Sequence, residues 1–261
     1  MKLHRINALM LKYYYITINR ADRLFDVVYW PIIDLFVWGF TGTYIQGLSN
    51  VNVLSMLLGG VILWVFAWRS SQDIAVFILE DFWSRNLYHL FTSPVKLNEH
   101  LTSIILIGFM RSLTTFLIMW PLGMIFYSFN ILTVSPFLIA LLVFLLTLFG
   151  WAIGLFIAGV IFRFGQRVQV LAWSVTFIIA PFACIYYPVS ALPPLSAKIA
   201  LLLPPAHVFE TFRALINGTA VNYNGLIYAF IISIVLFIAM AYFLNSSFKH
   251  SKKTGLLAKG D

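Results

Sequence analysis

The chain has few charged residues and almost no cysteine. Charged residues make up 10% of its 261 residues, whereas hydrophobic residues make up 61%. A soluble domain carries about 25% charged and 45–50% apolar residues, so this composition excludes a soluble globular protein and indicates an integral membrane protein. The single cysteine, Cys184, excludes an internal disulfide and a metal cluster built from cysteines.

Recognisable catalytic motifs are also missing. The sequence contains no G-x-x-x-x-G-K-[ST] phosphate loop, so we do not expect this chain to hydrolyse ATP. It has no H-E-x-x-H motif, and its five histidines are scattered. A dispersed Ser/His/Asp set leaves no local motif, but nothing here favours one. We therefore predict no catalytic residue, no metal site and no cofactor in this chain.

The sequence does contain apolar runs that are long enough to cross a bilayer. A helix needs about 20 residues to do so. Six such runs cover residues 27–46, 53–75, 101–127, 135–162, 168–186 and 225–245. They predict an all-α membrane protein with six transmembrane helices, organised as one domain over residues 1–261.

Basic residues are distributed unequally between the two sides of these spans. The gaps 47–52 and 128–135 carry no Lys or Arg, whereas Lys and Arg precede the first span and follow the sixth. Because cytoplasmic loops are enriched in basic residues, both termini are predicted to be cytoplasmic, including the tail 246–261. The same bias accounts for the formal charge of +8 without a nucleic-acid partner.

Residues 1–23 form a basic leader with amphipathic spacing. Leu3, Ile6, Met10 and Tyr13 recur every three or four residues. This pattern predicts a helix in the plane of the headgroups rather than across the membrane. The alternative is a leader that is merely basic and orients the first span. The segment lacks an uninterrupted apolar core and a small-residue cleavage site, so it is expected to be retained.

The loop 80–100 is long enough to hold a short cytoplasmic helix. We expect that helix to end at Ser93, because the residue before a proline is pushed out of the α conformation. Its apolar face would consist of Phe82, Trp83, Leu87, Leu90 and Phe91. Such a helix could transmit force from a soluble partner, or it could rest on the membrane surface.

Residues 181–213 hold six of the ten prolines, yet the segment is mostly apolar. Proline prevents an uninterrupted helix, and irregular backbone at membrane depth must be covered by protein or line a cavity. We therefore predict a re-entrant hairpin over 187–222, between the fifth and sixth spans, split into two short helices. The second would carry His207, Glu210 and Arg213 on one face. Either these side chains gate an exit route, or Glu210 complements the helix N-terminus and Arg213 sits near the membrane surface.

Charges inside spans are costly unless they are paired or hydrated. Four fall in the predicted spans: Asp34, Arg69, Asp73 and Arg111. We expect Asp34 to pair with Arg69 or Arg111, and Arg69 with Asp73 within one helix. The alternative makes Asp34 a proton or ion relay. Gly150-x-x-x-Gly154 allows close helix packing, either within a subunit or in a dimer.

Three stretches resemble the permease subunit of ABC-2 type exporters. They are RLFDVVYWPIIDLFVWG at the first span, LYHLFTSPVKLNEH before the third span, and the outer hairpin with the pattern YP-x-S-x-LP … P-x-x-x-x-x-E-x-x-R. The resemblance covers essentially the whole chain. It implies a half-transporter in the inner (plasma) membrane that works as a homodimer, with separate cytoplasmic ATPase subunits that bind ATP and Mg²⁺.

The same resemblance implies roles for individual residues. The leader would be the family's interfacial helix. The ATPase-coupling residues would be Glu80, Asp81, Phe82, Leu87, Leu90, Phe91, Ser93 and Pro94. The outer gate would be formed by Pro188, Pro193, Pro204, Pro205, His207, Glu210 and Arg213.

The resemblance to the family does not single out one class of substrate. Drug, lipid and lipid-linked glycan exporters share this layout, and aromatic residues suit a sugar or an apolar path. The first-span region lacks the Tyr-x-x-Ser-x-Leu-Gly-type stretch of the glycan group, which favours a drug or lipid-like substrate. Two other hypotheses compete: a proton-coupled secondary transporter that uses Asp34 and Arg111, and a non-transporting membrane scaffold or enzyme.

Overall fold

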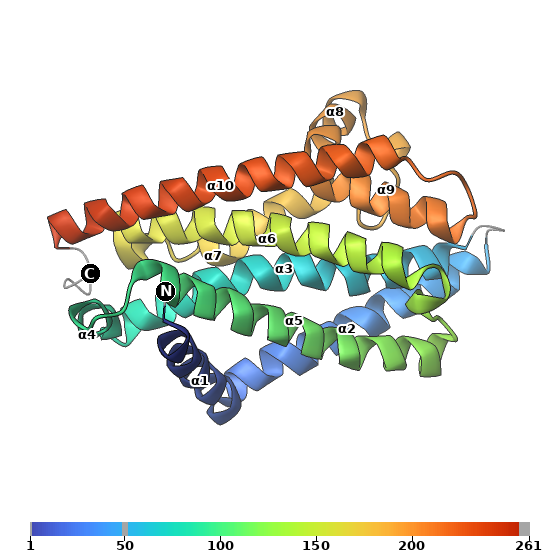
Figure 1. Ribbon diagram of the computed structural model, residues 1–261. Helices are drawn as coiled ribbons and strands as arrows, with labels where there is room; N and C mark the ends of the chain where they lie inside the picture. The colour runs from blue at the N-terminus through green and yellow to red at the C-terminus, as the bar shows by residue number, and fades with distance from the viewer. Residues whose placement is uncertain (1, 49–51, 256–261) are drawn as a thin grey trace.

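The computed structural model describes residues 2–48 and 52–255, and every regular element in this part of the chain is helical. Long helices run side by side, and shorter ones lie at the ends and on one flank (Figure 1). The α-helices are α1 Leu3–Asn19, α2 Ala21–Gln46, α3 Val53–Trp83, α4 Asn86–Thr92, α5 Leu97–Tyr127, α6 Pro136–Phe164, α7 Leu171–Ile179, α8 Pro194–Leu202, α9 Pro204–Ile216 and α10 Tyr223–Thr254.

Five helices of the described residues are long and apolar enough to cross a membrane: α2, α3, α5, α6 and α10. They correspond to five of the six predicted spans. A sixth candidate arises only if the bent pair α8 and α9 is counted as one span.

The predicted span 168–186 is wrong as a continuous helix. α7 ends at Ile179, and a 3₁₀ turn follows at Ala180–Phe182. Pro181 has no N–H with which to continue the helix. At 1.5 Å per residue the apolar helical segment Leu171–Phe182 is about 18 Å long. That is shorter than the roughly 30 Å hydrocarbon core of a bilayer.

The centre of the bundle is α3, which is buried along most of its length and packs against α2, α5 and α6. α6 lies between α3 and α10. The two glycines of the Gly150-x-x-x-Gly154 motif face α3: a Cβ on Gly150 would lie 2.5 Å from the carbonyl oxygen of Ala67. The motif therefore serves helix packing within the subunit, which is one of the two expected uses.

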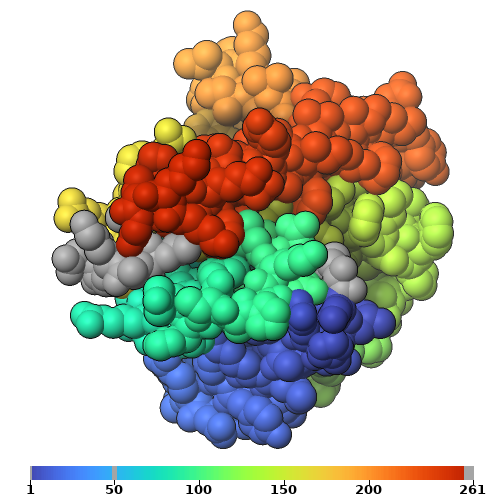
Figure 2. All heavy atoms as spheres, turned by 60° about the vertical axis from the view of Figure 1, so that its left-hand side comes forward, coloured from blue at the N-terminus to red at the C-terminus, as the bar shows by residue number. Residues whose placement is uncertain are grey.

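The start of α1 and the end of α10 lie at one end of the bundle (Figure 1). Figure 1 places the start of α1, the short helix α4 and the end of α10 together, and the end of α2 and the start of α6 at the opposite end. Seen from the first of these ends, α4 and the start of α5 lie between α1 and α10 (Figure 2). Both described termini are thus on the same side as the loop that connects α3 to α5.

Candidate functional site

The loop between α3 and α5 folds into a tight turn and a short helix. α3 ends at Trp83, and Arg85 adopts a left-handed conformation with φ 53° that reverses the chain into α4. α4 ends at Thr92, and Ser93 is extended, with φ −74° and ψ 166°, in front of Pro94. The predicted helix and its proline-determined end are confirmed.

One face of α4 is anchored to the bundle. Leu87 is 1% exposed, and the ring of Phe91 lies 4.6 Å from that of Phe248 in α10. Two of the five residues predicted for the apolar face of this helix lie outside α4. Phe82 belongs to the buried end of α3, and Trp83 is the last residue of α3 and is 41% exposed.

The other face of α4 points away from the bundle. Tyr88 is 54% exposed, although its ring is large and partly apolar. The exposed side chains of this segment, apart from Trp83 and Ser84, are Arg85, Tyr88, His89, Thr92, Ser93 and Pro94. We call these six residues the outer face of α4. A short helix with one anchored face and one exposed face can receive a partner and pass its movement to the bundle.

Beneath α4 lies a buried polar cluster that joins α1, α3 and α5. The Tyr13 hydroxyl donates to Asp81 Oδ2 at 2.6 Å, and His100 Nε2 lies 3.0 Å from the same oxygen. Lys12 forms an ion pair with Asp81, and Asn86 at the start of α4 donates to it at 3.4 Å. Tyr13 and His100 are 0% exposed. Burial, followed by the charge of Asp81, raises the pKa of Tyr13 well above its usual value, so the phenol keeps its proton.

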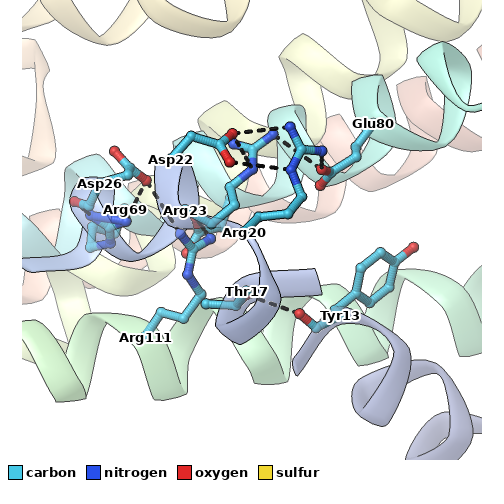
Figure 3. Close-up of polar contacts among 10 residues, drawn as sticks. Tyr13, Thr17, Arg20, Asp22, Arg23, Asp26, Arg69, Glu80 and Arg111 are labelled. Atoms are coloured by element: carbon cyan, nitrogen blue, oxygen red, sulfur yellow. Dashed lines mark hydrogen bonds and ion pairs between the residues drawn. The ribbon is translucent and has the colours of Figure 1, made fainter. Parts of the chain in front are cut away.

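Basic residues of the leader also hold the ends of α3 and α5. Arg20 Nη1 lies 2.5 Å from Glu80 Oε1, and Arg23 lies 3.4 Å from the same oxygen (Figure 3). Arg5 pairs with Glu99 at 3.5 Å and also donates to the carbonyl of Pro94.

Six of the eight proposed coupling residues lie away from the outer face of α4, since only Ser93 and Pro94 belong to it. Glu80 and Asp81 are 6% and 1% exposed, because α1 and the turn into α2 cover them. Sequence reasoning missed their partners, although the signal was present as the run of basic residues in the leader.

The intramembrane charges form a second network, and its centre is Asp26. Arg69 donates to the Asp26 carboxylate and to its backbone carbonyl, both at 2.7 Å (Figure 3). Arg111 lies 2.5 Å from Asp73 and 3.3 Å from Asp26. The network ties α2, α3 and α5 together; Arg69, Asp73 and Arg111 are buried, whereas the side chain of Asp26 is 43% exposed.

This network corrects two predictions. The expected pairing of Asp34 with Arg69 or Arg111 is wrong, and so is the expected Arg69–Asp73 pair within α3: Asp26 takes Arg69, and Arg111 takes Asp73. Within residues 2–48 and 52–255, Asp34 has neither an ion pair nor a hydrogen bond. Asp26 lies eight residues before Asp34 on α2, about 12 Å away along the helix axis. At the position of Asp26, α2 faces both Arg69 and Arg111.

Asp34 instead lines a cavity of about 740 Å³ between α2, α3, α7 and the segment that follows α7. Four tryptophans contribute to its wall: Trp30, Trp64, Trp68 and Trp173. The remaining lining residues are Asp26, Pro31, Val61, Val65, Arg69, Gln72, Phe177, Ala180, Pro181, Tyr186 and Tyr187. We call it the aromatic cavity.

The proline-rich segment forms two short helices, α8 and α9, bent by 97° at Leu203. Each begins with a proline in its first turn, where the missing N–H costs nothing. α9 packs closely on α3, since a Cβ on Gly59 would lie 1.9 Å from the ring of Phe212.

The polar side chains of α9 bind neighbouring backbone. Arg213 pairs with Glu210 at 3.0 Å and donates to the carbonyl of Cys184, a residue with a left-handed φ of 57°. Glu210 accepts the N–H of Val189 at 2.6 Å, and His207 Nε2 lies 2.8 Å from the carbonyl oxygen of Leu201.

The four prolines predicted for the outer gate divide into two pairs. Pro204 and Pro205 are buried at the start of α9, whereas Pro188 and Pro193 are exposed. The described residues contain no group of three or more His, Cys, Asp or Glu side chains that could hold a metal ion.

These features define a class: a helical, multi-pass membrane protein with a short helix exposed at the end where both described termini lie. Residues 38–243, more than half of the chain, match the family described as "ABC-2 family transporter protein", so the chain belongs to this family of membrane transporter permeases. A search of curated proteins gives no match to this chain.

Proposed function

We propose that this chain is the permease subunit of an ATP-driven exporter and that it carries substrate out across the inner membrane. The observation that supports this best is α4: one face is anchored at Leu87 and the other is exposed, in a family member that has no phosphate loop of its own. Such a permease needs a separate cytoplasmic ATPase, which would bind ATP and Mg²⁺.

In this proposal the ATPase contacts the outer face of α4. When ATP closes the ATPase pair, the push on α4 reaches the bundle through Leu87 and through Asn86, which donates to Asp81. Asp81 and Glu80 bind side chains of α1 and of the turn into α2, so α1 would move with α3 and α5. The buried coupling residues would thus transmit force rather than contact the ATPase.

The orientation follows from the same proposal. If α4 meets a cytoplasmic ATPase, both termini are cytoplasmic, and α1 lies along the inner headgroups. The α8–α9 hairpin would then be a re-entrant element at the outer mouth of the path. The contacts of His207, Glu210 and Arg213 with backbone suit a gate that is held shut in this conformation.

A second copy of the chain would complete the path. α2 exposes large apolar side chains such as Trp30 and Phe40, at 60% and 66%, and α7 exposes Phe177 at 63%. Both helices border the aromatic cavity. A homodimer that pairs these helices would place two such cavities beside the central path, which suits an amphipathic or hydrophobic substrate such as a drug or a lipid.

Co-purification tests the proposal. The full chain is expressed together with a phosphate-loop ATPase subunit from the same genome, and the ATPase recovered with it is quantified. Tyr88→Asp is expected to reduce recovery at least tenfold, because it puts a charge at the centre of the outer face of α4. Thr254→Asp adds the same charge at the exposed end of α10 and is expected to have no effect. Equal recovery with both variants would contradict the assignment of α4.

A further inference from the structure

Within residues 2–48 and 52–255, Asp34 is an acidic side chain without an ion-pair or hydrogen-bond partner, in the middle of a span. It lies 13 residues after the first residue of α2, about 20 Å along the helix. A charge at this depth costs several kcal/mol unless it is hydrated or paired. Asp26 and Asp73, the other two acids of this region, are both held by arginines. Asp26 and Asp34 both line the aromatic cavity, and of these two acids Asp34 is the one that no arginine holds.

The wall of that cavity suits a cation. The negative face of an aromatic ring attracts a positive charge, and tryptophan does so most strongly. Trp30, Trp64, Trp68 and Trp173 all line the aromatic cavity. Neighbours support some of the rings: Trp68 packs edge-on against Phe177 at 4.5 Å, and Trp38 stacks on the cavity residue Tyr186 at 3.8 Å.

The charge of the cavity has the matching sign. Arg69 is the only cation among its lining residues, and Asp26 neutralises it at 2.7 Å. Asp34 therefore leaves the cavity with a net negative charge when it is ionised. An anionic group beside Asp34 would be repelled, whereas a neutral ligand would leave the carboxylate unpaired.

We propose that the aromatic cavity binds hydrophobic or amphipathic substrates through a single cationic group, an ammonium or phosphonium, placed between Asp34 and the tryptophan rings. The inference rests on the proposed exporter function and narrows its substrate class. A volume of about 740 Å³ matches drug-sized ligands, whose pockets measure about 300–1,000 Å³.

Two ions of the same shape and opposite charge provide the test. Tetraphenylphosphonium and tetraphenylborate are titrated into the purified full-length protein in nanodiscs of neutral lipid, and quenching of tryptophan fluorescence is followed. Four of the eight tryptophans line the cavity, so binding there is visible. We expect saturable binding of the phosphonium at least tenfold tighter than that of the borate.

Substitutions locate the binding site. Asp34→Asn is expected to weaken phosphonium binding about tenfold or more and to leave borate binding unchanged or tighter, while Asp34→Glu keeps the preference. Asp22→Asn removes an exposed carboxylate from the same helix and is the matched control, with no expected effect. Equal affinity for the two ions, or unchanged phosphonium binding in Asp34→Asn, would overturn the inference.

The same preparations separate this inference from the proposed function. If the ATPase binds normally but the protein does not prefer the phosphonium, only the cationic substrate class is wrong. If the phosphonium binds through Asp34 and the ATPase does not associate, the cavity assignment stands and the ATP-driven mechanism fails.

Discussion

Neutralising Asp73 is expected to destabilise the bundle strongly. Asp73 and Arg111 are 2% and 5% exposed, and their side chains lie 2.5 Å apart. Asp73→Asn preserves the shape of the side chain and removes only its charge. Arg111 would then remain buried with one carboxylate, that of Asp26, at 3.3 Å.

The size of the effect follows from the desolvation of the arginine. Removing one partner of a buried ion pair costs about 3–5 kcal/mol, because the other charge is left uncompensated. Since Asp26 still contacts Arg111, we expect the lower end, about 3 kcal/mol. The exposed pair of Asp22 with Arg20 is the comparison: Asp22→Asn should cost about 0–1 kcal/mol.

Unfolding in mixed micelles titrated with dodecyl sulfate measures this difference. The double variant Asp73→Asn/Arg111→Gln removes both charges, and we expect it to recover about 1–3 kcal/mol relative to the sum of the single variants. If Asp73→Asn unfolds within 0.5 kcal/mol of the wild type, a threshold of about the usual measurement scatter, the buried network does not hold α3 to α5. Strict additivity of the two changes would also refute the pairing.

Two further predictions concern the packing of the bundle. Tyr13→Phe removes the 2.6 Å hydrogen bond to the Asp81 carboxylate and should cost about 1.5–3 kcal/mol at neutral pH, measured by thermal unfolding. Because burial raises the pKa of Tyr13, the wild type should lose stability as pH rises above about 10, where the unfolded phenol ionises first, and Tyr13→Phe should lose less. Gly150→Leu should lower the unfolding midpoint by several degrees, because its Cβ would lie 2.5 Å from the Ala67 carbonyl oxygen. Ala140→Leu introduces the same side chain at an exposed position of α6 and should leave the midpoint unchanged.

Local sequence signals predicted the elements whose ends are fixed by single residues. The end of α4 before Pro94 needed only the steric restriction that proline imposes on its predecessor. The division of the proline-rich segment at Leu203 likewise followed from Pro204 and Pro205. Hydropathy found the five long helices because each is a long apolar run.

Partner choice between helices was not predictable from one sequence. Whether Arg69 meets Asp26 or Asp34 depends on how far α2 slides along α3, and both acids lie on α2. Hydropathy did not predict that α7 is short, because the residues on both sides of the helix break are equally apolar. The burial of Glu80 and Asp81 depends on the leader folding back onto α3, a contact between residues about 60–70 apart in sequence.

The aromatic cavity is built from elements that were predictable, but its assembly depends on contacts between helices that were not. Asp34, Trp30, Trp64 and Trp68 come from long helices that hydropathy identified, and Trp173 comes from the short α7. Nothing local indicates that Trp30 and Trp173 share one wall. That wall exists because α2 and α7 both pack on α3.

The central claim is that the outer face of α4 meets an ATPase, and a photocrosslink tests it most directly. Tyr88→p-benzoylphenylalanine in the full chain, irradiated in native membranes that contain the cell's phosphate-loop ATPases, is expected to yield one crosslinked product with one such ATPase. Thr254→p-benzoylphenylalanine, at the exposed end of α10, is the matched position and should yield none. Absence of the crosslink at position 88, with the ATPase present and the chain folded, would contradict the account.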